Sequence, residues 1–381
     1  MPVWKNALGS RPAGAAAPAV AGRGEQVEWL NAARGLAILL VIFHHTVWFA
    51  YLTDLADPRW MLVDAVFNAF RMPMFFAVSG VLTAAVLTRP WRAVLGRRVV
   101  PLVWVYVVWT VAVELLEPAL PPGGGPVPGV VQIASRVLLG DSDAWYLYAL
   151  VVFAVVAKLT ARVPTWVVLG VLTASAVVFG SDLVVPDSYA LHSMAMYALF
   201  FFAGTRFRGR VLALPRSGVR WWGAAAGAVG FAAIAGAAYL VLGSQALSVP
   251  GVKLVLSFAA LAAGYLFSVW VVGVAVGVPL TAVGRLTLSF YVTHTLVARL
   301  LLLAALAVLP GAAASSALGQ LVVPVLLVVA TIGAVAVVRV PLDRVPGLFA
   351  PPRWLVRRIA PAARPGTPAA GVPEQRRQRL P

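Results

Sequence analysis

The sequence predicts an all-α polytopic membrane protein, with about ten transmembrane helices packed in one bundle. Of its 381 residues, 61% are hydrophobic and only 11% are charged, which is too apolar for a soluble globular protein. Long uncharged stretches recur between residues 29 and 340, and each is about as long as the ~20 residues that a helix needs to cross a bilayer. The chain has no cysteine, which excludes disulfides, cysteine-ligated metals and a thiol nucleophile.

Ten apolar segments, delimited by charged residues and helix breakers, are the predicted spans. They lie near residues 30–50, 68–88, 99–117, 145–161, 165–185, 188–205, 221–243, 254–276, 284–307 and 318–339. An amphiphilic stretch from Arg59 to Phe67 is expected to lie at the membrane surface. We divide the chain into a disordered tail (1–28), a transmembrane domain (29–340) and a basic tail (341–381). The first tail has no apolar core with a small-residue cleavage site, so no cleavable signal peptide is predicted.

The basic residues predict the orientation of the bundle. The net charge is +17, and most arginines cluster near residues 89–98, 206–220 and 339–379, between or after the spans. Most acidic residues lie in the alternate connections. Because positively charged segments stay in the cytoplasm, both termini are predicted to be cytoplasmic, in a multi-pass protein of the plasma membrane. Attraction to the lipid bilayer accounts for the basic clusters, and no nucleic-acid partner is expected.

The first predicted span carries a cation and an imidazole on one face. Arg34 and His45 are eleven residues apart. That is about three helical turns, so the two side chains point in nearly the same direction, roughly 16 Å apart along the axis. Ionisable groups inside a membrane are costly and mark function by default. An imidazole titrates near neutral pH, so His45 is the predicted general base or nucleophile. His44 points about 100° away and is expected to have a structural role.

The second and third spans contain further candidates. Arg71 is a potential donor to a substrate hydroxyl, phosphate or carboxylate, and Ser79 beside a glycine allows close helix approach. Arg97 and Arg98 precede the third span, where they either anchor it on the cytoplasmic side or bind phosphate. Glu114, in the outer part of that span, either orients a histidine or is solvated at the helix end.

The fourth and ninth spans add aromatic and hydroxyl groups. Trp145 begins the fourth span and is most simply an anchor at the membrane interface. The ninth span places Ser289, Tyr291 and His294 near mid-membrane, and buried groups of this kind need polar partners. Arg285, near the cytoplasmic end of the ninth span, repeats the arrangement of the first, with a cation at the mouth and an imidazole deeper. No metal site is predicted, because the four histidines stand without clustered carboxylates.

Several of these segments together resemble the acyltransferase-3 family of integral membrane O-acyltransferases. That family has an Arg, ten intervening residues and a His in its first helix, which match Arg34 and His45. A Phe-Phe-x-x-Ser-Gly element in its second helix matches residues 75–80, and a basic pair before a proline matches residues 97–101.

Two later elements extend the resemblance along the chain. A Trp-aromatic-Leu element matches residues 145–147, and a late Ser–Tyr–His element is approximated by residues 289–294. The matches are in the family's order and cover residues 29–305. The chain departs from many members at Ala144, where they have a polar residue, and at residues 94–95, where they have a basic one.

The resemblance implies transfer of an acyl group, usually acetyl from acetyl-CoA, to a hydroxyl of a carbohydrate or related acceptor. Acyl-CoA would be a co-substrate, and no permanently bound cofactor is expected. The resemblance places Arg34, Arg97 and Arg98 on the acyl-CoA, and it makes His45 the general base or the acyl carrier. The residues expected to support the acceptor side are Arg71, Ser79, Glu114, Trp145, Tyr291 and His294.

A second hypothesis comes from another class of protein. Intramembrane arginines and histidines also line the pathways of secondary transporters, so the chain could instead move a glycolipid or small solute, with His45 as a proton relay. The acceptor of the enzyme stays open between a surface polysaccharide, a glycolipid, a peptidoglycan sugar and a secreted secondary metabolite.

Overall fold

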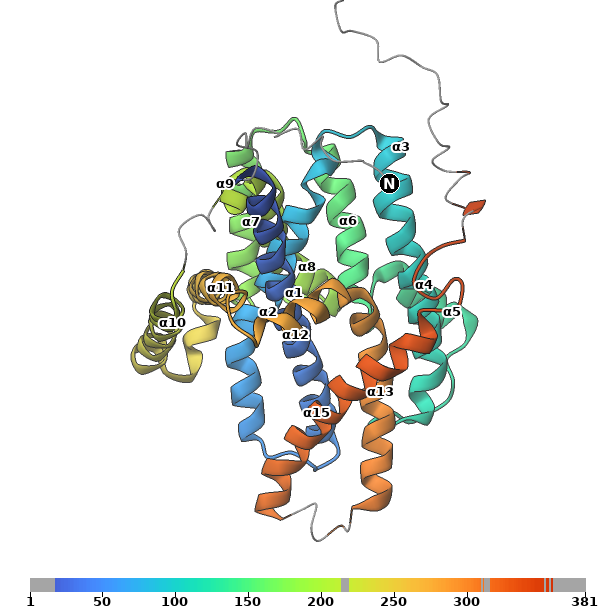
Figure 1. Cartoon of the computed structure of the whole chain (residues 1–381). Helices are drawn as coiled ribbons and strands as arrows, with labels where there is room; N and C mark the ends of the chain where they lie inside the picture. Colours follow the sequence, from blue (N-terminus) through green and yellow to red (C-terminus); the bar gives the residue numbers. More distant parts are fainter. Residues whose placement is uncertain are drawn as a thin grey trace, which may run out of the picture.

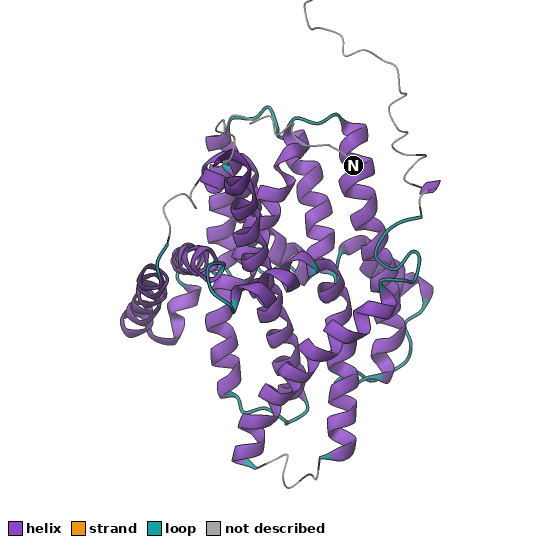
Figure 2. Ribbon diagram, viewed as in Figure 1, coloured by secondary structure: helices purple, strands orange, loops and turns teal. Residues whose placement is uncertain are grey.

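A computed structural model describes residues 18–213, 219–309, 311, 316–352, 354–355 and 358. Within these residues, the regular secondary structure is entirely helical (Figures 1 and 2). The predicted tails at residues 1–17 and 359–381 lie outside the described residues. The all-α fold class is therefore confirmed for the described part of the chain.

The helices fall into three groups by length and type. The long α-helices are α1 (Pro18–Leu52), α2 (Arg59–Thr83), α4 (Val100–Leu116), α8 (Tyr189–Arg206), α10 (Trp221–Leu242), α11 (Val252–Val271), α13 (Thr287–Val308) and α15 (Ala317–Leu342). The shorter α-helices are α3 (Trp91–Val94), α5 (Val130–Leu139), α6 (Trp145–Leu159), α7 (Thr165–Gly180), α9 (Arg208–Ala213) and α12 (Gly277–Arg285). Four short helical segments of other types are η1 (Ala84–Leu87), η2 (Leu95–Val99), η3 (Glu117–Ala119) and η5 (Gly243–Ser248).

Each of the ten predicted spans overlaps one of these helices, but not all ten helices are long and apolar enough to cross a membrane. Seven are, counting the continuous segment Trp91–Ala119 as one. Helices α6 and α7 have only 15 and 16 residues, and α8 is made less apolar by polar residues such as His192 and Arg206. Seven candidate spans are thus found in the described residues, and ten crossings with cytoplasmic termini stay a prediction.

Two predicted boundaries differ from the structure near the N-terminus. Helix α1 begins at Pro18, so the last part of the predicted disordered tail is helical. The stretch predicted at the membrane surface forms the first turns of α2, which runs without a break from Arg59 to Thr83. Its apolar residues extend the second span, and this is why the amphiphilic pattern did not mark a separate element.

Glycines let the central helices approach closely. A Cβ on Gly35 of α1 would lie 2.0 Å from the Leu280 carbonyl oxygen of α12. Between α2 and α8, a Cβ on Gly80 would lie 2.0 Å from the Phe201 carbonyl oxygen, and one on Gly204 would lie 2.2 Å from that of Ala77. No side chain fits at these positions, so the backbones themselves are in contact. The predicted close approach at Ser79-Gly80 is confirmed.

The bundle has a distinct inner and outer end. Helix α1 ends and α2 begins at the lower end in Figure 1, where α13 ends and α15 begins as well. The charge distribution predicts that this end faces outward, and we call it the outer end. Helices α6 and α8 start part-way up the bundle and end near the opposite, inner end. The α10–α11 hairpin is seen end-on at one edge, where nearly all of the apolar surface of α10 is left uncovered by the other described helices.

The chain after α15 packs back onto α4. The indole N–H of Trp104 donates to the Gly347 carbonyl oxygen at 2.6 Å, and that of Trp109 donates to the Leu348 carbonyl oxygen at 2.9 Å. The rings of Trp109 and Phe349 are 5.6 Å apart. Residues 347–349 therefore pack on α4, although they lie beyond residue 340, where the transmembrane domain is predicted to end. The reason is that buried indole N–H groups need acceptors, which this segment supplies.

Candidate active site

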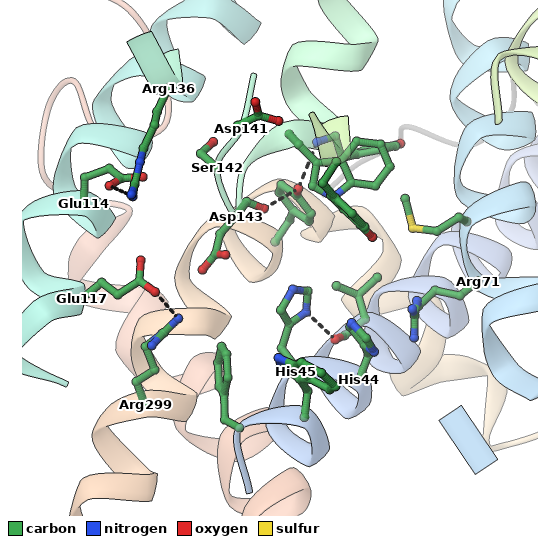
Figure 3. Close-up of a pocket in the computed structure, with 18 of the residues that line it drawn as sticks. His44, His45, Arg71, Glu114, Glu117, Arg136, Asp141, Ser142, Asp143 and Arg299 are labelled. Carbon is green, nitrogen blue, oxygen red and sulfur yellow. Dashed lines mark hydrogen bonds and ion pairs between the residues drawn. The ribbon is translucent and has the colours of Figure 1, made fainter. Parts of the chain in front are cut away.

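The candidate site is a cavity of about 740 Å³, and Figure 3 draws most of the residues that line it. Helices α1, α2, α4, α5, α6, α8 and α13 all contribute to its wall. The predicted site residues that line it are His45, Arg71, Glu114, Trp145 and Tyr291. Residues more than 240 positions apart in the chain thus meet in one space.

His45 lies on the wall of this cavity with one nitrogen committed to the protein. Its Nδ1 is 3.0 Å from the Val41 carbonyl oxygen and 3.3 Å from Nε2 of His294. A carbonyl oxygen can only accept, so Nδ1 of the neutral ring carries the hydrogen and donates it. In the described part of the chain, His45 Nε2 has no hydrogen-bond partner. His45 therefore presents an unprotonated nitrogen, with the lone pair that a base or a nucleophile needs.

His294 fixes this arrangement from behind. Its Nδ1 is 2.6 Å from the Tyr291 carbonyl oxygen, so Nδ1 donates and Nε2 is left as an acceptor for His45. The side chain is fully buried. A partner on Nδ1 that sets the tautomer and ring orientation is the usual support of a catalytic imidazole. The sequence predicted His294 as a polar residue at mid-membrane, and the structure places it directly against His45.

His44 also lines the cavity, through a different set of contacts. Its Nδ1 is 2.8 Å from Asp64 Oδ2, and Arg71 donates to the other oxygen of the same carboxylate at 2.8 Å. Arg71 donates further to Asn68 Oδ1 at 3.1 Å. The structural role expected for His44 is present, but its ring faces the cavity as well. Asp64 was not among the predicted site residues, although it stands seven residues before Arg71 on one face of α2.

The start of α6 is held by two tyrosines. Tyr291 donates its hydroxyl hydrogen to the Asp143 carbonyl oxygen at 3.0 Å and accepts from the backbone N–H of Tyr146 at 3.3 Å. The Tyr146 hydroxyl is 2.5 Å from Ser79 Oγ and donates to the Phe75 carbonyl oxygen at 3.3 Å. Ser79 is therefore not on the cavity wall but ties α2 to α6 at its floor.

Two arginines lie on the inner side of that floor. Arg34 and Arg98 are both close enough to Tyr146 to interact with it electrostatically, and they interact with each other. Arg98 donates to Thr83 Oγ1 at 2.5 Å, while its buried Nε has no partner among the described residues. Arg34 makes no hydrogen bond within the described part of the chain. Neither cation has a carboxylate partner there, so the pair forms a positive patch suited to an anion.

Arg97 does not join this patch. It is exposed, whereas the neighbouring Arg98 turns inward. The two stand on η2, a π-helical turn of residues 95–99. Pro101 cannot donate a backbone hydrogen to the residue 97 carbonyl, which favours such a widened turn. The structure thus places Arg34 and Arg98 together beside Tyr146 and Arg97 apart from them, and the binding role predicted for the three arginines stays a prediction.

The outer rim of the cavity is built from ion pairs that the sequence analysis did not assign. Arg136 pairs with Glu114, and Arg299 donates to Glu117 Oε1 at 2.6 Å (Figure 3). The Arg299 guanidinium also lies 4.2 Å from the centre of the Phe49 ring. Of these four residues, only Glu114 was among the predicted site residues, without its partner. Their pairing depends on how α4, α5 and α13 pack, which the sequence alone does not specify.

The loop between α5 and α6 supplies a further carboxylate. Burial raises the pKa of Asp143 to about 6, and the nearby Glu117 and Glu114 carboxylates add to the effect while Arg299 opposes it. Thr295 also interacts with this side chain. Asp143 thus holds its proton more tightly than an ordinary aspartate.

Comparison with known proteins decides the family. Residues 27–339 match a family model described as an acyltransferase domain, which is most of the chain. The chain belongs to the acyltransferase-3 family. The predicted resemblance is thereby confirmed. The predicted location, as a multi-pass protein of the plasma membrane, is confirmed as well.

One relative is similar to this chain over a shorter region. Inner membrane protein YcfT of Escherichia coli (strain K12) is 28% identical over 157 residues, which is 35% of this chain and 44% of that protein. The match thus spans less than half of the relative's length. No solved structure matches this chain.

Proposed function

We propose that the protein is an O-acyltransferase that moves an acyl group, with acetyl the expected one, from cytoplasmic acyl-CoA to a hydroxyl of an acceptor bound in the outer cavity. The observation that carries the proposal is the free Nε2 of His45 on the cavity wall, with its tautomer fixed by Val41 and His294. An acceptor hydroxyl needs a base at that position, and the family supplies the acyl chemistry.

The His45–His294 contact gives the proton a defined route. The acceptor oxygen attacks the thioester carbonyl carbon, its proton moves to His45 Nε2, and the thiolate of CoA leaves. The imidazolium so formed is stabilised through its Nδ1–H, which donates to His294 Nε2 and to the Val41 carbonyl. A positioned general base is typically worth about 10²–10⁴ in rate. In the covalent alternative, the same Nε2 carries the acyl group before the acceptor attacks.

The inner positive patch supports a cytoplasmic donor. Acyl-CoA carries phosphates, and guanidiniums without carboxylate partners are suited to bind them. Arg34 and Arg98 lie across the Tyr146–Ser79 contact from the cavity. In our proposal the pantetheine arm passes this contact, so that the thioester reaches His45 while the nucleotide part stays at the inner end.

Acyl transfer by the purified protein in lipid nanodiscs tests the proposal. With radiolabelled acetyl-CoA and a cell-envelope extract as acceptor, we expect label to enter the extract, and His45→Gln to lower the rate at least 100-fold. The matched control is His192→Gln, because His192 lies on α8 away from the cavity and pairs with Asp182 at 3.5 Å. Wild-type rates in a correctly inserted His45→Gln variant would refute the mechanism. Uptake of a solute without any covalent change would favour a transporter instead.

A further inference from the structure

The cavity that His45 faces contains more carboxylates than guanidiniums. Its acidic residues are Glu114, Glu117, Asp141, Asp143 and Asp187. Its arginines are Arg71, Arg136 and Arg299. Each of these arginines already has a carboxylate of its own, in Asp64, Glu114 and Glu117 respectively. The remaining acidic residues therefore leave the cavity with a negative charge, opposite to the patch at the inner end.

The three remaining carboxylates differ in their surroundings. Asp141 accepts from Ser188 Oγ at 2.6 Å and from the Ala190 N–H at 3.2 Å, so it is satisfied by the start of α8. Asp187 lines the cavity but is exposed to solvent. Only Asp143 has a buried carboxylate oxygen, Oδ2, that lacks a hydrogen-bond partner among the described residues.

Asp143 is also placed to meet a molecule bound next to His45. Figure 3 shows its carboxylate directed into the space between the Glu117–Arg299 pair and His45. Burial, together with the nearby carboxylates of Glu117 and Glu114, makes a further negative charge there unfavourable and raises the pKa of Asp143 to about 6. A positively charged donor beside Asp143 would reduce the repulsion between the carboxylates and would give Oδ2 a hydrogen-bond partner.

Aromatic rings provide the other half of a site for such a molecule. Trp145 and Tyr189 meet edge to face, with ring centres 5.7 Å apart, and both line the cavity. Aromatic faces attract cations and also pack against the apolar faces of sugar rings. Trp48 on α1 adds an exposed ring to the same wall.

We propose that the acceptor is a small polyhydroxylated amine, such as an amino sugar with a free ammonium group, and that Asp143 binds the ammonium while a neighbouring hydroxyl faces His45. This inference rests on the proposed function and adds the chemical class of the acceptor. Acceptors with a carboxylate or phosphate at the same position are excluded by the negative charge of the cavity.

The pairing also explains which atom is acylated. An ammonium held by Asp143 keeps its protons and has no lone pair, so it cannot attack the thioester. The hydroxyl oxygen forms the bond to the carbonyl carbon, the carbon–sulfur bond breaks, and the hydroxyl proton moves to His45 Nε2. The leaving thiolate then takes up a proton, and the products are an O-acyl amine and CoA.

Binding of three matched sugars tests the inference without requiring turnover. Glucosamine, glucose and glucuronate share the same kind of sugar ring but differ in charge. Near pH 7 glucosamine is positively charged, glucose is neutral and glucuronate is negatively charged. We would measure their binding to the full-length protein in nanodiscs by calorimetry at pH 7 and equal ionic strength. Glucosamine should bind at least tenfold more tightly than glucose, and glucuronate least. Asp143→Asn should remove the advantage of glucosamine, whereas Asp182→Asn should keep it.

The control makes the same change of charge on the outer side but outside the cavity. Asp182 has a left-handed backbone (φ of 56°), which asparagine also tolerates, so this variant should fold. Equal binding of the three sugars, tighter glucuronate, no binding of glucosamine, or an unchanged preference in Asp143→Asn would each overturn the inference. Acetyl-CoA consumption, measured in parallel, reports separately on the proposed function. Transfer with no preference for glucosamine would refute only the inference, and preferential binding without transfer would refute only the function.

Discussion

Replacing Asp143 by asparagine should stabilise the protein at neutral pH. The change keeps the size of the side chain and leaves the Asp143 carbonyl oxygen, which accepts from Tyr291, untouched. It removes a carboxylate whose Oδ2 is buried without a partner among the described residues and which faces the charges of Glu114, Glu117 and Arg299. The variant thus isolates the free-energy cost of ionising this one group in the folded protein.

The size of that cost follows from the pKa of Asp143. It is about 6 in the folded protein against an ordinary value of 3.8. This difference of about two pKa units corresponds to roughly 3 kcal/mol. Because the folded state holds the proton more tightly, the free energy of unfolding is highest below pH ~4, falls as the pH rises to 6, and stays low above it. Asparagine cannot ionise, so the free energy of unfolding of the variant should not fall in this way between pH ~4 and 6.

Thermal unfolding followed by tryptophan fluorescence gives the readout. For a protein of this size, 3 kcal/mol corresponds to a Tm difference of about 4 °C. We expect the variant to unfold about 4 °C above the wild type at pH 7.5, with the difference shrinking to nothing near pH 4. Asp182→Asn serves as the control, and its Tm should differ from that of the wild type by the same amount at pH 4 and at pH 7.5. A variant that is less stable than the wild type at pH 7.5, or a difference independent of pH, would contradict this reasoning.

Three further predictions concern packing, buried charge and topology. Gly80→Ala should destabilise the protein by about 1–3 kcal/mol, because its Cβ would lie 2.0 Å from a carbonyl oxygen of α8, whereas Gly230→Ala on α10 meets nothing and should be neutral in the same thermal scan. Asp64→Asn should lower the free energy of unfolding by about 3–5 kcal/mol, since it leaves the buried guanidinium of Arg71 without its charge partner. Chemical denaturation in detergent measures this loss, and an unchanged free energy of unfolding would show that the pair does not stabilise the protein. Reporter fusions after Arg210 and after Pro361 should both report cytoplasm, and a periplasmic signal at either would overturn the predicted orientation.

Hydropathy could predict where the helices lie, because each apolar segment is a local property of the chain. It could not predict their lengths at the cavity. Helices α6 and α8 start part-way through the bundle, and their N-terminal residues are fixed by contacts from elsewhere, such as Tyr291 on Asp143 and Asp141 on Ser188. These contacts join segments separated by 148 and 47 residues, and no local pattern records them.

The candidate site was predictable to the extent that costly residues mark it. His45 and Arg34 stood out because a membrane helix carries them at a price in free energy, and the same rule applied to Arg71 and His294. The rule finds residues but not their partners. It gave no reason to join His45 to His294, and it did not single out Asp64, whose carboxylate holds two side chains at once.

The packing of the C-terminal segment on α4 has a consequence for the order in which the protein is completed. The indole N–H groups of Trp104 and Trp109 find their acceptors 243 and 239 residues later in the chain. At the usual rates of synthesis, that separation takes roughly ten seconds or more. Until then, α4 sits in the bilayer with two polar hydrogens unmatched, and only the arrival of residues 347–348 matches them. Residues 347–348, which are made long after α4, therefore complete the third predicted span.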